Sequence, residues 1–120
     1  MSQMARFQEI LRRLAIFDEG LVDPGFGLDR PDTSALDAKT TALLQVAVSV
    51  AIGSSAVCLQ WSAARALAAG ATEDEVADVL LVIAPVAGLG RITAAAPDLA
   101  IALGYDVTAG LEELDQAVYE

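Results

Sequence analysis

The segment Leu43–Thr72, LLQVAVSVAIGSSAVCLQWSAARALAAGAT, decides the fold that this sequence predicts. It contains two alanine-rich apolar runs of helical length, separated by Gly53-Ser54-Ser55 and closed by Gly70. Glycine adopts the left-handed backbone conformation that ends helices, so both breaks have a physical cause. We therefore expect one helix from Ala38 to about Gly53 and another from about Ser55 to Ala69, packed together as a hairpin.

Polar residues mark the starts of two helices. Asp37 precedes the first helix of the hairpin, where its carboxylate can accept the unpaired amides of the first turn. Thr72 and Glu75 have the spacing of a capping box, and the acidic residues Glu73 and Asp74 lie in the first turn, where the helix dipole favours negative charge. This pattern predicts a helix that begins at Glu73.

Pro85 interrupts the apolar pattern that follows Glu73. Proline has no amide hydrogen, so it cannot bond back to the carbonyl of Leu81. We therefore expect the helix from Glu73 to kink near Pro85 and to resume through Gly88 toward Ala96.

The C-terminal quarter contains a second proline and a further helix-ending glycine. Pro97 and Asp98 are expected to open a short helix that ends at Gly104. An acidic helix is expected from Thr108 onward. Since no segment has the pattern of a strand and turn, the sequence predicts an all-α fold of about six helices.

The first 35 residues differ in pattern from the rest. Apolar side chains recur there at helical spacing opposite several arginines, which predicts an amphipathic helix that packs as a lid or arm; these side chains are Phe7, Ile10, Leu11, Leu14 and Phe17. From Asp18 to Ala35 the sequence is rich in Gly, Pro and Asp, which predicts a long loop. We expect this helix and loop over residues 1–35 and a helical domain over residues 36–120, in a single domain overall.

Composition limits the partners that the chain can have. Of its 120 residues 55% are hydrophobic and its mean hydropathy is +0.51, more apolar than an isolated domain of this size easily buries. We therefore expect a homo-oligomer. The formal net charge of −10 repels phosphate backbones and anionic lipids, so neither nucleic acid nor a membrane is expected as a partner. Gln45 and Ser49 interrupt the apolar run Ala42–Leu59, which otherwise has the length of a membrane span.

The chain contains one cysteine and no histidine. These counts exclude an internal disulfide and the usual zinc and soft-metal ligand sets, so neither a metal nor a cofactor is expected. The first 17 residues, MSQMARFQEILRRLAIF, do not have the pattern of a secretory signal. A reducing cytoplasm therefore fits this sequence.

Cys58 is the first candidate for a catalytic residue. Ser55, Cys58 and Ser62 are spaced by three and four residues, which places them along one face of the expected helix. Near a helix N-terminus the dipole favours a thiolate, which indicates a reactive thiol. A buried structural thiol is the favoured alternative, because no Lys, Arg or His lies within one turn. The serines lack a histidine as general base, so capping and packing are their favoured roles.

Arg91 is the first candidate for a binding residue. It is the only charged residue between Asp78 and Asp98, in an otherwise apolar stretch. An arginine in such a place forms a structural or inter-subunit ion pair, or anchors a substrate carboxylate that its forked donors match. Arg65 and Trp61 lie on the helix that carries the thiol and are further candidates for lining an apolar pocket.

Several motifs together resemble the carboxymuconolactone decarboxylase and alkylhydroperoxidase D-like family. They are the apolar hairpin with its GSSAVC turn, the AL-x-x-GAT-x-x-E segment over residues 66–75, and the glycine-containing APVAGLGR segment. The resemblance covers Leu36–Gly104 and implies an alkylhydroperoxidase D-like helical domain that assembles as a trimer or hexamer. The ending APDLAIALGYDVTAGLEELD resembles a bacterial subgroup of that family that lacks its redox pair.

The family's best-known chemistry depends on four positions. In the peroxidase branch a glutamate, two cysteines and a histidine carry a proton relay and disulfide chemistry, and the resemblance aligns them with Leu43, Ser55, Cys58 and Ser62. Only the second cysteine is retained. A thiol without a resolving thiol cannot close an internal disulfide, and neither Leu43 nor Ser62 can shuttle a proton at neutral pH. The resemblance therefore implies the fold without peroxidase activity. It also implies small lactone carboxylates as substrates of the decarboxylase branch, which typically has a histidine where Ser62 stands here.

Three hypotheses of function follow from the sequence, and they leave open whether the protein is an enzyme. The first is a protein that binds or transforms a small apolar carboxylate or lactone at a subunit interface, with a pocket formed by Arg91, Trp61, Ser62, Ser55 and Arg65. The second is a thiol-dependent peroxidase that uses Cys58 and an external reductant. The third is a non-catalytic interaction module whose acidic last helix, over residues 111–119, docks a partner protein.

Overall fold

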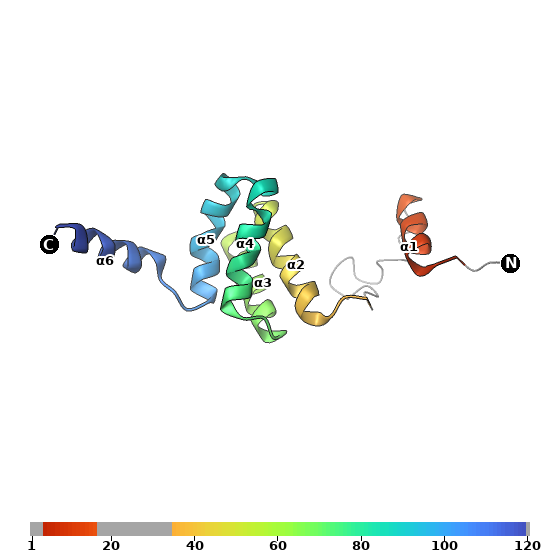
Figure 1. The fold of residues 1–120 in the computed structure, drawn as a ribbon, viewed down its shortest axis with the longest axis horizontal. Helices are drawn as coiled ribbons and strands as arrows, with labels where there is room; N and C mark the ends of the chain where they lie inside the picture. Colours follow the sequence, from red (N-terminus) through yellow and green to blue (C-terminus); the bar gives the residue numbers. More distant parts are fainter. Residues whose placement is uncertain (1–3, 17–34, 120) are drawn as a thin grey trace. The chain divides into compact units, whose positions relative to one another are not determined.

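The computed structural model describes residues 4–16 and 35–119, which form six α-helices and no β-strand (Figure 1). The chain divides into two compact units, Met1–Ala35 and Leu36–Glu120. The first contains α1 (Arg6–Ala15), and the second contains α2 (Ala38–Ala51), α3 (Ala56–Ala68), α4 (Glu73–Ala87), α5 (Leu89–Ala102) and α6 (Val107–Tyr119). The predicted all-α fold of about six helices is confirmed. None of the helices in these described ranges is long and apolar enough to cross a membrane.

Helix α1 is amphipathic, as its sequence pattern predicts. Its first turn is closed by Gln8, whose side-chain oxygen accepts the amide of Ala5 at 2.9 Å. None of its residues is buried, and Phe7, Leu11 and Leu14 are exposed on its apolar side. Its role as a lid or arm stays a prediction. The loop predicted over Asp18–Ala35 lies, apart from its last residue, outside the described residues.

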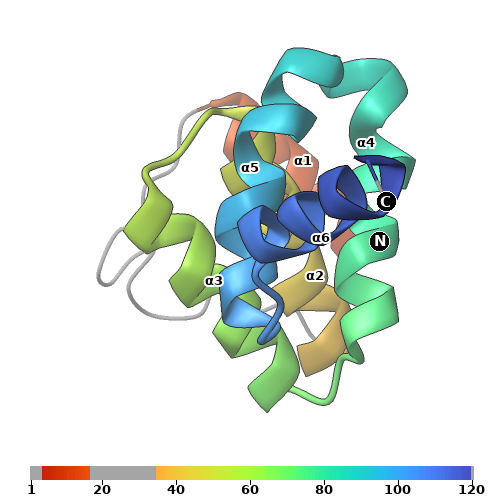
Figure 2. The same cartoon turned by 90° about the vertical axis from the view of Figure 1, so that its left-hand side faces the viewer.

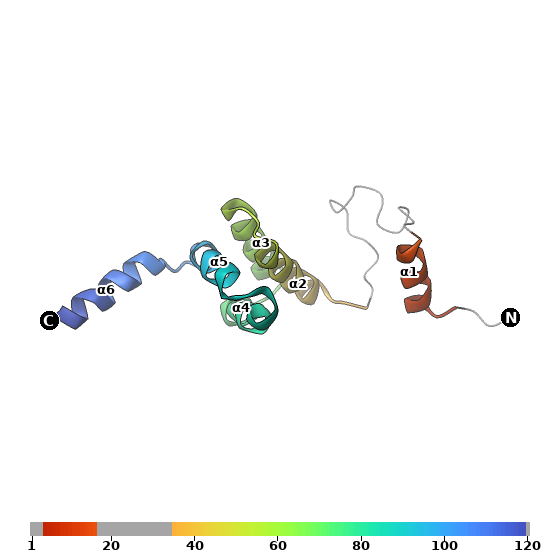
Figure 3. The ribbon, with the colours of Figure 1, turned by 90° about the horizontal axis from the view of Figure 1, so that it is seen from above.

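Helices α2 to α5 of the second unit pack together (Figure 2). Their buried side chains form one small core. Helices α2 and α3 lie side by side, and α4 and α5 pack against them (Figure 3). Alanine supplies half of the core residues, and such small side chains let helix axes approach closely. The core residues are Ala42, Val46, Val50, Leu59, Ala63, Ala66, Ala71, Val76, Ala95 and Leu99.

The α2–α3 hairpin forms where the sequence predicts it. Helix α2 is capped by Asp37, whose Oδ1 accepts the amide of Thr40 at 2.7 Å. Gly53 takes a φ of +72° in the turn, and Ser55 is the N-cap of α3. Gly70 takes a φ of +100° just after α3. Because glycine adopts such angles without strain, Gly53 ends α2 and Gly70 ends α3, while Ser55 caps the start of α3.

The boundary between α4 and α5 differs from the prediction. Helix α4 continues through Pro85 to Ala87. The helical conformation ends at Gly88, where φ is +89° and ψ is +150°. Pro97 lies inside α5 and does not open a new helix. The φ of proline is compatible with a helix, and Pro85 loses its backbone bond only near the end of α4, whereas the conformation of Gly88 cannot belong to a helix. The predicted continuation of one helix through Gly88 and the predicted short helix from Pro97 are therefore wrong, whereas the kink expected near Pro85 stays a prediction.

Glu75 ties the start of α4 to the start of α2. Its Oε1 accepts the amide of Thr72 at 2.9 Å, while its own amide donates to Thr72 Oγ1 at 3.1 Å, so the predicted capping box is confirmed. Its Oε2 lies 3.0 Å from Nζ of Lys39 in the first turn of α2. The Thr72 amide is the main cause that lowers the pKa of Glu75, and the hydrogen bond to Glu75 is the main cause that raises the pKa of Lys39.

Helix α6 is the predicted acidic helix and packs only against α5 among the described helices. Asp106 caps it by accepting the amide of Ala109 at 3.2 Å. The apolar side chains of Leu111, Leu114 and Val118 are exposed. Docking of a partner protein on this helix stays a prediction.

We expect stability to decrease in acid because two caps depend on carboxylates. The pKa values of Glu75 and Asp37 are lowered from their ordinary 4.5 and 3.8, in each case chiefly by a backbone amide, so both groups are ionised more readily in the folded state. Their contribution is complete above those ordinary values and is lost as pH falls through the lowered folded-state pKa values. Urea unfolding at several pH values in this acidic range measures the slope of the free energy of unfolding against pH.

The double substitution Asp37→Asn and Glu75→Gln keeps neutral capping groups and should flatten this slope. The matched control, Asp74→Asn and Glu73→Gln, removes the same charge from the first turn of α4, where neither residue makes a hydrogen bond to a cap, and should leave the slope largely unchanged. Equal slopes in both double variants would contradict the assignment.

Candidate functional site

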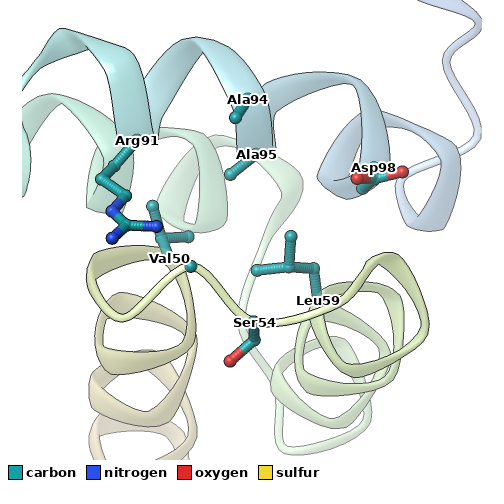
Figure 4. Close-up of a pocket in the computed structure, with 8 residues that line it drawn as sticks. Val50, Ser54, Leu59, Arg91, Ala94, Ala95 and Asp98 are labelled. Atoms are coloured by element: carbon teal, nitrogen blue, oxygen red, sulfur yellow. The ribbon is translucent and has the colours of Figure 1, made fainter.

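A pocket of about 260 Å³ lies between α5 and the turn that joins α2 to α3 (Figure 4). This volume is below the roughly 300–1,000 Å³ typical of pockets for drug-sized ligands, so the pocket suits a smaller molecule. Helix α5 supplies half of its lining, and the C-terminal part of α2, the turn and the first turns of α3 supply the rest. The lining residues are Val50, Gly53, Ser54, Leu59, Arg91, Ala94, Ala95 and Asp98.

The pocket has a charged group of opposite sign toward each end. Arg91 and Asp98 are seven residues apart on α5, which is two helical turns, or about 10 Å along the axis. In Figure 4 the Arg91 side chain points toward the turn, Asp98 lies at the other end, and Leu59 lies between them. The pocket therefore has an apolar middle between two ends of opposite charge.

Gly53 makes room for Arg91. A Cβ built on Gly53 would collide with a terminal nitrogen of the Arg91 guanidinium and would lie 2.9 Å from its Cζ. The guanidinium thus occupies the space that any other side chain at position 53 would need. The positive φ of Gly53 adds a second, conformational reason for glycine at this position.

Neither charged group of the pocket is neutralised within the part of the chain that the structure describes. Arg91 is exposed and forms no ion pair with any residue of the ranges 4–16 and 35–119. Asp98 is half-buried and has no hydrogen-bond or ion-pair partner in the same ranges. The structural ion pair expected for Arg91 is therefore absent among these residues, whereas an inter-subunit pair and a carboxylate anchor stay predictions.

Both candidate serines bond to the backbone of α3. Ser55 Oγ accepts the amide of Cys58 at 3.4 Å, as an N-cap residue does. Ser62 is buried, and its hydroxyl donates to the carbonyl of Leu59 at 3.0 Å. These contacts are the capping and packing roles that the absence of a histidine base favoured.

Cys58 is exposed in this chain, so the favoured prediction of a buried thiol is wrong. The reason is its position in the first turn of α3, where the adjacent Leu59 takes the core-facing side. Trp61 is 61% exposed, and the Arg65 guanidinium lies over its ring, 4.7 Å from the centroid. Such a contact between a cation and an aromatic ring accounts for the placement of both side chains.

The predicted site residues therefore separate into two groups. Arg91 lines the pocket, whereas the pocket lining includes none of the α3 candidates, which are Cys58, Trp61, Ser62, Ser55 and Arg65. The sequence analysis missed Ser54 and Asp98. The spacing of seven residues places Asp98 on the same helical face as Arg91, but the helix start expected at Pro97 hid this signal. The described residues contain no group of three or more His, Cys, Asp or Glu side chains that could hold a metal ion.

A model of the carboxymuconolactone decarboxylase family matches residues 8–100, which is more than half of the chain. The chain belongs to the carboxymuconolactone decarboxylase family. The match includes every residue that lines the pocket. The family resemblance predicted from sequence is thus confirmed, while the bacterial subgroup stays a prediction. No curated protein and no solved structure matches the chain.

This carboxymuconolactone decarboxylase family member has no proton-transfer group at the positions that the resemblance aligns with the peroxidase relay. Leu43 is half-buried and packs against the core from α2. Ser62 is held by a backbone carbonyl of its own helix. Cys58 has no second thiol in the chain to resolve it.

We predict that Gly53→Ala moves the Arg91 side chain. The added methyl group would collide with the end of a flexible side chain, which can rotate away at low energetic cost. The stability loss should therefore come mainly from the left-handed backbone and amount to about 1 kcal/mol. Urea unfolding measures this loss, and the side-chain NMR resonance of Arg91, assigned with Arg91→Lys, reports the movement.

Gly70→Ala is the matched control for this substitution. Gly70 also has a positive φ, but a Cβ there would meet no atom within 4 Å. We expect a similar loss of stability and an unchanged Arg91 resonance. An Arg91 resonance that is the same in Gly53→Ala and in the wild type would contradict the packing of Arg91 on Gly53.

Proposed function

We propose that this protein binds a small apolar carboxylate or lactone carboxylate in the Arg91 pocket, at an interface between identical subunits. The observation that supports this most directly is the exposed Arg91 guanidinium beside an apolar cavity, without an ion-pair partner among the described residues. Guanidinium donors match a carboxylate in two parallel hydrogen bonds. Val50, Leu59 and Ala94 offer contact to the apolar body of the ligand.

The subunit interface is part of the proposal because apolar side chains are exposed next to the turn that lines the pocket. Ile52 is 67% exposed and Val57 is 75% exposed, and they lie on either side of the turn that closes the pocket. Further exposed apolar residues lie on α4, where Val86 is 92% exposed. Surfaces of this kind mark protein contacts, so a second subunit covering Ile52 and Val57 would also enclose the ligand.

We predict that Arg91→Gln weakens the binding of pentanoate about tenfold or more, since it removes charge-assisted hydrogen bonds. Isothermal titration calorimetry measures the affinity, and the methyl ester of pentanoate, which lacks the charge, should bind no better than this variant binds pentanoate. Arg65→Gln is the matched control, because it removes the same charge outside the pocket and should leave the affinity unchanged. Equal affinity of Arg91→Gln and wild type for pentanoate would refute the anchor.

We predict that the wild type sediments as an oligomer at micromolar concentration and that Ile52→Asp shifts it toward the monomer. A charge at this position would have to be buried without a partner in the contact. Ala77→Asp adds the same charge at an exposed position of α4 whose side chain is small, and it should leave the assembly intact. A monomeric wild type in sedimentation velocity would overturn the interface.

A second candidate function is a thiol-dependent peroxidase that uses Cys58, and the exposure of this thiol is the observation in its favour. The chain has no histidine to move a proton and no second cysteine to form an internal disulfide. We therefore expect peroxide consumption in the presence of dithiothreitol to be the same for the wild type and for Cys58→Ser. A faster wild type would favour the peroxidase over the binding protein.

A further inference from the structure

Asp98 is the one lining residue of the Arg91 pocket with a carboxylate side chain. It is half-buried on α5 and has no partner among the residues that the structure describes. Burial of a charged group without a partner is unfavourable, and a donor or a cation brought by the ligand would remove that cost. Asp98 does not bind the carboxylate that Arg91 anchors. We therefore expect it to contact the other end of the ligand.

The positions of the two charges limit the shape of the ligand. Arg91 and Asp98 project from the same helix two turns apart and line the same cavity. The lining between them is apolar and includes Leu59 from α3 and Ala95 from α5. A short unbranched chain with a polar group at each end satisfies both ends and keeps its middle in apolar contact.

The chemical nature of the second polar group of the ligand follows from the negative charge of Asp98. An ammonium or hydroxyl group would donate to the carboxylate, whereas a second carboxylate would meet a like charge in a partly buried setting. Repulsion of this kind is a common source of specificity between ligands that share one anchoring group.

We propose that Asp98 is a specificity-determining residue that selects monocarboxylates with a hydrogen-bond donor opposite the carboxylate and excludes dicarboxylates. This inference rests on the proposed function, because Asp98 can contact the second polar group of the ligand only when Arg91 anchors the carboxylate. It narrows the ligand class to short ω-amino or ω-hydroxy acids and their close analogues.

The test compares three acids of equal chain length: δ-aminovalerate, δ-hydroxyvalerate and glutarate. Calorimetry on the wild-type protein should give similar affinities for δ-aminovalerate and δ-hydroxyvalerate. The affinity for glutarate should be at least tenfold weaker, a factor that corresponds to about 1.4 kcal/mol. In Asp98→Asn this ratio should fall toward one, because the amide no longer repels the second carboxylate. Asp98→Glu keeps the charge and should keep the order of the three acids.

Asp78→Asn removes the same charge from α4, outside the pocket, and should leave the ratio as in the wild type. If Asp98→Asn, folded by circular dichroism, keeps the wild-type ratio while Arg91→Gln weakens all three acids, the role of Asp98 is wrong and the carboxylate anchor stands. If Arg91→Gln binds all three acids as the wild type does, the proposed function itself fails. A wild type that binds glutarate as tightly as δ-aminovalerate would also overturn the role of Asp98.

Discussion

Close packing of small side chains is the constraint on which the second unit depends. Alanine fills five of the ten core positions, and it lets α2, α3 and α5 approach one another around Val50, Leu59 and Leu99. This proximity brings α5 against the α2–α3 turn and so creates the pocket between them. Larger side chains at these contacts would separate the helices and remove the pocket together with the core.

The pocket of this family member includes Leu59 of α3 but not the single thiol that the same helix carries. Helix α3 presents Cys58 and Trp61 to the surface and uses its serine hydroxyls for its own backbone. Helix α5 presents two opposite charges to a cavity. The aligned peroxidase positions and the pocket are therefore different places in one fold, and a protein can lose function at one while binding a ligand at the other.

The sequence predicted the features that depend on local chemistry. The hairpin, the Gly70 stop and the Thr72–Glu75 capping box follow from short-range rules, and all three are confirmed. The helix that carries Asp98 was misjudged, because a proline with a helical φ satisfies both a helix start and a helix interior, and only packing decides between them. The exposure of Cys58 likewise depends on which side of α3 meets the other helices, which no local pattern states.

Gly53 has two structural roles. Its backbone conformation turns the chain between α2 and α3, and its missing side chain is the space in which the Arg91 guanidinium lies. An arginine at position 91 can take this place only while position 53 is glycine, whereas the left-handed turn needs the glycine with or without the arginine. The position of the positive charge in the pocket is therefore set by a residue that carries no charge itself.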